Sequence, residues 1–135
     1  MNAKIVLHIS RAVHAGRISF PDVVRELLAA GVESYRVDYV AGIKTHYGAD
    51  GEIAVVPIAF EGLPPVAATF DEAALVADLR DSQAGKQDYR AFSVRAMQAG
   101  VASYAAHLHG QRVVYCGRHG DHYVEWFPGA NPRTS

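Results

Sequence analysis

The sequence of 135 residues contains only one cysteine, Cys116, so no disulfide can form within the chain. A single thiol is typical of proteins in a reducing compartment, and we expect the protein to be cytoplasmic. An excess of positive charge is also lacking, because 13 lysines and arginines stand against 14 aspartates and glutamates, for a formal net charge of −1. General nucleic-acid binding requires a basic surface that neutralises phosphates, so nucleic acid is not an expected partner.

Long hydrophobic runs are missing as well. A helix that spans a membrane needs about 20 consecutive apolar residues, and no stretch of the sequence approaches that length. The first residues, 1–13, are interrupted by Lys4, His8 and Arg11, so they do not resemble the apolar core of a signal peptide. The sequence therefore predicts a soluble protein with no membrane partner.

The most informative feature of the sequence is an internal repeat. Hydrophobic residues make up 50% of the chain, which is enough to build the core of one compact domain. The segment Ala-Gly-Val-Glu-Ser-Tyr at residues 30–35 returns as Ala-Gly-Val-Ala-Ser-Tyr at residues 99–104, an offset of 69 residues. A repeat of this length corresponds to a whole supersecondary unit that is used twice.

Each copy of the repeat predicts two helices followed by a three-stranded meander. Apolar residues at helical spacing, good N-cap residues and terminal glycines indicate the helices, and alternating apolar and polar residues between glycine turns indicate the strands. The first copy predicts helices over residues 4–14 and 20–30 and strands over 34–39, 43–47 and 52–57. The second copy predicts helices over residues 72–84 and 89–99 and strands over 101–109, 112–116 and 121–127. The predicted fold class is α+β, an internally duplicated unit whose antiparallel sheet is covered by helices on one face.

We expect a single domain over residues 1–135, made of repeats 1–57 and 70–128. The connector, residues 58–69, contains two adjacent prolines, which favour an extended and stiff link. Residues 129–135 have the composition of a frayed tail.

Several motifs resemble those of a known bacterial family. They are Gly-Arg-Ile-Ser-Phe-Pro at residues 16–21, Ala-Gly-Val-x-Ser-Tyr-x-x-Asp at 30–38, Tyr-Gly-Ala-Asp-Gly-Glu at 47–52, and the closing Tyr-Cys-Gly-Arg-His-Gly-Asp-His-Tyr-Val-Glu at 115–125 with Phe-Pro at 127–128. Together they resemble the YbcV-like family, a domain of unknown function whose members are sometimes labelled phage envelope proteins. The resemblance implies a bacterial protein and supplies no activity or catalytic residues.

Histidine is unusually frequent, with seven residues in the chain. His107 and His109 lie two positions apart in a predicted strand, so both side chains project from one face. With His122 they form a candidate site for a divalent transition metal such as zinc, since neutral imidazoles are common ligands of these ions. A metal-dependent enzyme of the hydrolase type is therefore one functional hypothesis. The alternative is that these histidines are polar residues on the solvated face of an antiparallel sheet.

Cys116, His119 and Asp121 are the residue types of a cysteine nucleophile with its base and orienting acid. They share one short turn, however, whereas catalytic groups have to converge in space. The sequence favours the interpretation that Cys116 packs as a small apolar residue.

Our leading functional hypothesis is a non-enzymatic binding module for a small molecule or a protein partner. If the two copies pair their strands across a pseudo-twofold axis, the exposed face brings Arg36, Asp38 and His46 near His107 and His109. The candidate ligand-binding residues are Arg36, Asp38, His46, Tyr47 and Tyr115. Trp126 and Phe127 could instead form the seam of a homodimer, as aromatic residues are common at interfaces.

Overall fold

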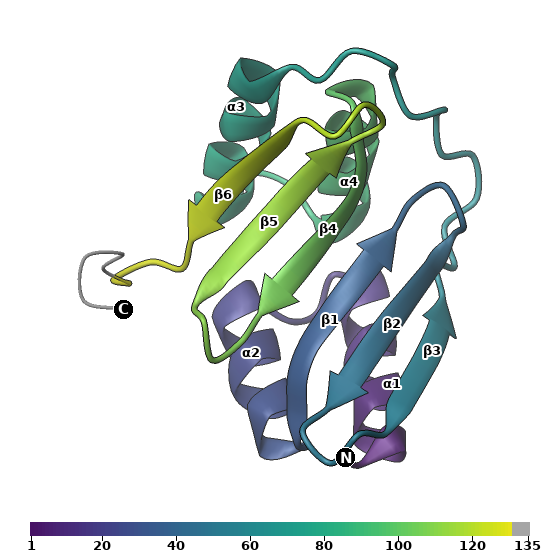
Figure 1. Cartoon of the computed structure of the whole chain (residues 1–135), viewed down its shortest axis with the longest axis vertical. Coiled ribbons are helices and arrows are strands. Elements are labelled where there is room, and N and C mark those ends of the chain that lie inside the picture. Colours follow the sequence, from purple (N-terminus) through teal and green to yellow (C-terminus); the bar gives the residue numbers. More distant parts are fainter. Residues whose placement is uncertain (131–135) are drawn as a thin grey trace.

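The structure of the protein is a computed structural model, which describes residues 1–130. Helices and strands follow one another in the order helix, helix and three strands, and this order occurs twice. The helices are α1 (Ala3–His14), α2 (Phe20–Ala29), α3 (Glu72–Gln83) and α4 (Tyr89–Gln98), and the strands are β1 (Val32–Asp38), β2 (Ile43–Gly48), β3 (Ile53–Pro57), β4 (Val101–His107), β5 (Arg112–Gly117) and β6 (His122–Trp126). The predicted α+β class is confirmed (Figure 1).

Short polar side chains begin three of the four helices. Asn2, Asp71 and Asp88 each accept a hydrogen bond from a backbone N–H of the first turn of α1, α3 and α4, respectively. This contact satisfies one of the backbone donors that a helix leaves free at its start. Ser19 precedes α2 but makes no such side-chain hydrogen bond, and the start of this helix has Pro21 in its first turn instead.

The six strands form one antiparallel sheet in the order β3-β2-β1-β4-β5-β6. The first three strands and the last three are joined by the central pair, β1 and β4, in which Arg36 lies opposite Ala105. Each half is a meander connected by short turns, as Figure 1 shows. The strands of the two halves therefore pair directly, through β1 and β4.

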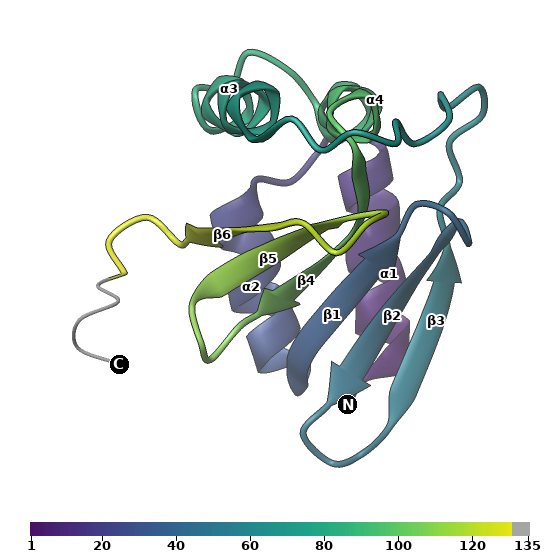
Figure 2. The ribbon, with the colours of Figure 1, turned by 45° about the horizontal axis from the view of Figure 1, so that its top comes forward.

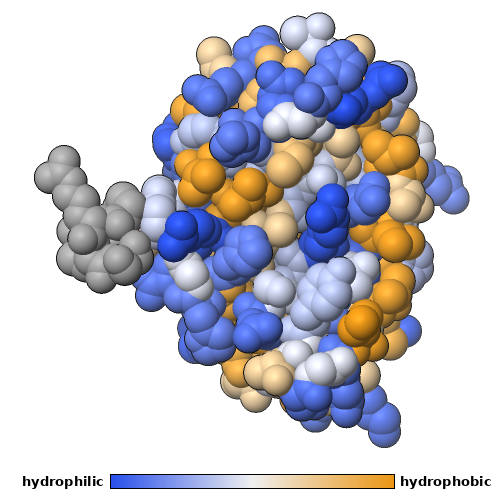
Figure 3. Space-filling view, in the orientation of Figure 1, coloured by the Kyte–Doolittle hydropathy of each residue, from blue (hydrophilic) through white to orange (hydrophobic). Residues whose placement is uncertain are grey.

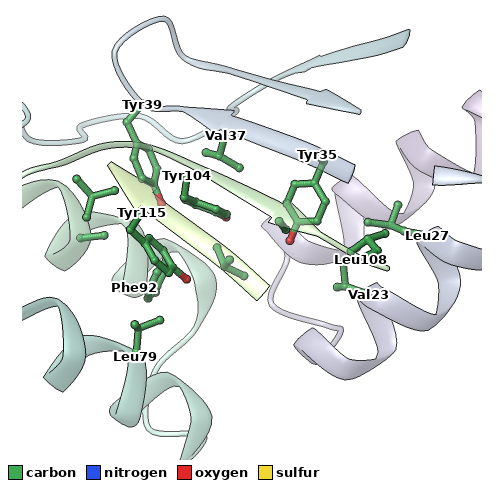
Figure 4. Close-up of a cluster of buried hydrophobic side chains, with 14 of the residues drawn as sticks. Val23, Leu27, Tyr35, Val37, Tyr39, Leu79, Phe92, Tyr104, Leu108 and Tyr115 are labelled. Carbon is green, nitrogen blue, oxygen red and sulfur yellow. The ribbon is translucent and has the colours of Figure 1, made fainter. Parts of the chain in front are cut away.

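All four helices lie on the same side of the sheet and leave the other side uncovered (Figure 2). The buried face carries a cluster of tyrosine rings around Tyr104. The distances between ring centroids from Tyr104 are 6.4 Å to Tyr35, 6.0 Å to Tyr39 and 5.2 Å to Tyr115. Figure 4 shows these rings with Leu27 of α2 beyond Tyr35. Aromatic packing of this kind adds to the stabilisation from buried area.

The connector between the halves, residues 58–71, contains no helix or strand. It passes close to the start of β4, where Gly100 has a φ of 92° and a side-chain carbon would collide with the backbone of Thr69 and Phe70. Only glycine combines this left-handed conformation with so close a backbone approach. The lack of a side chain at Gly100 therefore allows the connector to lie this close to the start of β4.

No helix in residues 1–130 has both the length and the apolar character needed to cross a membrane. Of the tail that the sequence predicts to be frayed, Gly129 and Ala130 belong to a turn in which the Ala130 N–H donates to the Phe127 carbonyl at 2.9 Å. Residues 131–135 lie outside the described part of the chain.

Candidate functional site

The uncovered face of the sheet contains a shallow hollow of about 510 Å³. It lies over β1, β4 and β5, where the two halves of the sheet meet. Its lining consists of Glu33, Ser34, His107, His109, Gly110, Arg112 and Val114. Figure 3 shows this face of the molecule, with polar residues across the middle and hydrophobic ones over β3 at the right. The hydrophobic residues there include Ile53 and Val55, which are 61% and 58% exposed.

The strand register explains why these side chains lie together. Ser34 of β1 is opposite His107 of β4, and His107 is opposite Arg112 of β5, so the three form one row across the central strands. Directly opposite residues project from the same face of an antiparallel sheet. The ladder is irregular at Glu33, whose carbonyl accepts a hydrogen bond of 3.2 Å from the Leu108 N–H. Glu33 thus lies at this irregularity, at the start of β1, and its side chain belongs to the lining of the hollow.

Arg112 is held from two sides. Its Nε donates to the Gly110 carbonyl at 3.2 Å, and its guanidinium lies 4.1 Å from the centroid of the Trp126 ring. A cation over an aromatic face is stabilised by the ring quadrupole. Within residues 1–130 the hydrogen bonds of Arg112 use only Nε, so the terminal N–H donors of its planar guanidinium are available to another partner. Arg112 is therefore the best positioned group in the hollow for binding a carboxylate or a phosphate.

The two histidines and the glutamate of the hollow are exposed, in contrast to the half-buried Arg112. Imidazoles can donate hydrogen bonds to an anion and gain positive charge below neutral pH. Glu33 has the opposite charge and would favour a ligand that also carries a hydrogen-bond donor. The combination fits a polar ligand with an acidic group better than it fits a purely apolar one.

Of the predicted ligand-binding residues, Arg36 and Asp38 lie on β1 but not in the hollow. Arg36 donates from Nη2 to the hydroxyl of Ser103 at 3.2 Å. Asp38 is opposite Ser103, at the other end of the β1–β4 pair from His107, and its Oδ1 accepts from the N–H groups of the following turn. The expectation that Asp38 lies near His107 and His109 is wrong, because the antiparallel register that places Ser34 opposite His107 places Asp38 four residues further along β1, opposite Ser103.

His46 and Tyr115 are on the face that the helices cover. His46 is 4% exposed and Tyr115 is 5% exposed, so the prediction that His46 lies on the open face is wrong. The reason is the register, in which His46 is opposite Tyr35 on the buried side. Tyr47, the next residue of β2, is 36% exposed and belongs to the open face.

The predicted metal ligands are not brought together as a set. His107 and His109 both line the hollow, but His122 is opposite Cys116, at the end of the β5–β6 pair that is remote from Arg112 and His107. Within residues 1–130, no three His, Cys, Asp or Glu side chains are arranged so that they could hold a metal ion. The arrangement therefore does not favour a zinc site built on His107, His109 and His122.

The sequence did not single out Glu33 or Arg112, and it indicated Trp126 only as part of a homodimer seam. Arg112 begins a strand and Trp126 ends one, and only the pairing of β5 with β6 places them opposite one another. A prediction of the full strand register would have found this contact. The position of Glu33 in the hollow could not have been predicted in this way, because it depends on the irregular ladder at the start of β1.

A family model described as "Protein of unknown function (DUF1398)" matches residues 8–125, which include every residue that lines the hollow. The chain is also similar to two proteins described as uncharacterized, Mb2035 of Mycobacterium bovis and Rv2012 of Mycobacterium tuberculosis. Each is 30% identical over 118 residues, which cover 84% of this chain and 69% of the relative. The predicted membership of a family of unknown function with bacterial members is confirmed at this level.

Proposed function

The chain belongs to the DUF1398 family, and we propose that it is a non-enzymatic binding module that recognises an acidic group in the hollow of its open sheet face. The observation that supports this proposal is the position of Arg112, fixed between Gly110 and Trp126 beside two exposed histidines. A positioned guanidinium can form two parallel hydrogen bonds to a carboxylate or a phosphate.

The shape of the hollow supports binding rather than catalysis. Its histidines and Glu33 are exposed, so water has free access to any bound group. Enzymes gain most of their electrostatic stabilisation in sites that exclude water. The open face would instead suit reversible recognition of a small acidic molecule or of an acidic side chain on a protein partner.

The test is an amide NMR titration of the full chain with benzoate and phenyl phosphate at constant ionic strength. We expect saturable shifts that centre on Ser34, His107, His109 and Arg112. The substitution Arg112→Gln should abolish them, because it removes the charged fork and keeps a side chain of similar length. Arg11→Gln is the matched control, because Arg11 is an exposed arginine of α1 on the other side of the sheet. Shifts that are absent, or that survive Arg112→Gln, would overturn the proposal.

A further inference from the structure

The helix-covered face of the sheet contains a buried lysine. Lys44 of β2 is 4% exposed and lies between Val37 of β1 and Val56 of β3. Its ammonium nitrogen is 4.4 Å from the centroid of the Tyr89 ring. None of the ion pairs within residues 1–130 includes Lys44. A buried cation is normally paired with a carboxylate, and contact with an aromatic ring compensates for lost hydration only in part.

Two further buried polar groups have no hydrogen-bond partner within residues 1–130. They are Nδ1 of His46 and the hydroxyl of Ser10, and both residues are 4% exposed. His46 is two positions from Lys44 on the same face of β2, and its ring stacks on Tyr35 at 5.5 Å between centroids. Buried polar atoms are nearly always hydrogen-bonded, and an unpartnered one requires an explanation.

The histidines beside Lys44 are held in the neutral form. Burial, assisted by the positive charge of Lys44, lowers the pKa of His46 to about 4 and also lowers the pKa of His14. Nδ1 of His14 lies 2.7 Å from the Ser10 carbonyl, and its Nε2 accepts from the Ala59 N–H at 3.4 Å, which together assign the proton to Nδ1. Lys44 is therefore a lone positive charge among neutral rings.

The other half of the sheet shows that the fold does not require a lysine here. Lys44 is opposite Val37 and His46 is opposite Tyr35 in the β1–β2 pair. In the β4–β5 pair the same places are taken by Val113, opposite Ala106, and by Tyr115, opposite Tyr104. The second half thus fills the place of Lys44 with an apolar side chain that is 4% exposed. Lys44 and His46 therefore have no counterparts of the same type in the second half, so the packing of the fold does not explain why they are lysine and histidine.

From these contacts we propose that Lys44, His46 and Ser10 form an internal binding site for a small carboxylate. Lys44 and Ser10 can each donate a hydrogen bond to a ligand whose polar atoms only accept, and Nδ1 of His46 can do so in the tautomer that carries the ring proton there. The single charge of a carboxylate matches the single ammonium, and the rings of Tyr35 and Tyr89 suit a short apolar tail.

The connector forms the outer wall of this site. The ring of Phe60 lies 4.7 Å from that of His14 and 5.9 Å from that of Tyr89, between centroids. Because the segment has neither helical nor strand hydrogen bonds of its own, it can yield at a lower cost than the sheet or the helices. A small acid would reach Lys44 past Phe60.

The experiment is a titration of the full chain with sodium acetate and sodium propionate against sodium chloride at equal ionic strength, followed by the NMR signals of the His14 and His46 rings and the amides of β2. We expect these signals to shift to saturation with either carboxylate and to stay in place with chloride. Lys44→Met should weaken the binding by at least about tenfold, because it removes a charged hydrogen-bond donor. Arg112→Gln should leave it unchanged, and this result separates the internal site from the hollow on the open face.

Two further variants keep the proposal open to refutation if Lys44→Met does not fold. Lys44→Arg retains the charge and should retain saturable binding, whereas Ser10→Ala should weaken binding without changing the amide spectrum of the free protein outside α1. Non-saturating shifts in the wild-type protein would overturn the proposal. Saturable shifts that are unaffected by both Lys44→Met and Ser10→Ala, or that centre on His107 and Ser34, would overturn it equally.

Discussion

The carboxylate of Asp78 on α3 accepts a hydrogen bond of 2.6 Å from the side-chain amide of Gln87, in the turn before α4. Asp78 has no exposed surface, and its second oxygen has no hydrogen-bond partner within residues 1–130. Arg95 of α4 is 3.5 Å away. A buried, half-satisfied carboxylate thus joins the two helices that cover the second half of the sheet.

Asp78 should make the protein less stable as the pH rises from about 4 to about 6. Burial raises the pKa of Asp78 to about 6, although the hydrogen bond from Gln87 and the charge of Arg95 act in the opposite direction. Below the ordinary pKa of aspartate, near 4, Asp78 is protonated in both the folded and the unfolded chain. Between pH 4 and pH 6 it is protonated in the folded chain alone. Its contribution to the free energy of unfolding is therefore complete at low pH and falls, by up to about 3 kcal/mol, as the pH rises through 6.

Urea unfolding of the wild-type protein and Asp78→Asn between pH 4 and pH 7.5 measures this contribution. Asparagine can still accept from Gln87 and has no charge to bury, so we expect the variant to gain stability relative to wild type as the pH rises. A difference between the two proteins that does not change with pH would contradict the raised pKa.

His46 should produce the opposite dependence. Burial and the positive charge of Lys44 lower the pKa of His46 to about 4. The folded chain therefore binds this proton only near pH 4, whereas the unfolded chain binds it near pH 6.5. Its contribution to stability is complete above pH 6.5 and is lost, by up to about 3 kcal/mol, as the pH falls toward 4. The His46 ring signal should not titrate between pH 8 and pH 5, and His46→Phe should remove this part of the acid dependence of unfolding.

The helices and strands could be predicted because their signals are local. The apolar spacing of α2 and the glycines that follow it, such as Gly31, are visible in the sequence, as is the alternation in β1. The pairing of β1 with β4 could also be inferred, since the repeat implies a symmetric arrangement of the two halves. These features need no knowledge of distant contacts.

The faces of β2 could not be predicted in the same way. Its alternation places Ile43, Thr45 and Tyr47 on one side and Lys44 and His46 on the other, and hydrophobicity alone assigns the second set to water. The structure buries Lys44 and His46, because the tyrosine-rich face of β1 pairs with them. The hollow was also beyond prediction, since the row from Ser34 through His107 to Arg112 depends on the register of three strands.

Gly100→Ala should destabilise the protein far more than Gly51→Ala. The two glycines have similar backbone angles, with φ of 92° and 88°, so each substitution places alanine in the left-handed region at a cost of about 1 kcal/mol. At Gly51 a new side-chain carbon meets no atom within 4 Å, but at Gly100 it meets the backbone of Thr69 and Phe70. We expect a loss of at least about 3 kcal/mol at Gly100, measured by urea unfolding, because the connector must move. Equal losses in the two variants would show that the connector does not rest on this glycine.

Zinc should not bind to His107, His109 and His122 as one set. The first two line the hollow, whereas His122 lies opposite Cys116 at the far end of β5. A metal ion holds imidazole nitrogens at about 2 Å, so it cannot use ligands from both ends of a strand. Titration of metal-free protein with zinc, followed by the imidazole NMR signals, should show no shift that His107 and His122 share at one equivalent. His122→Gln should therefore leave the response of His107 and His109 unchanged. A joint response of all three rings, lost in His122→Gln, would require a different arrangement of β4, β5 and β6 in solution.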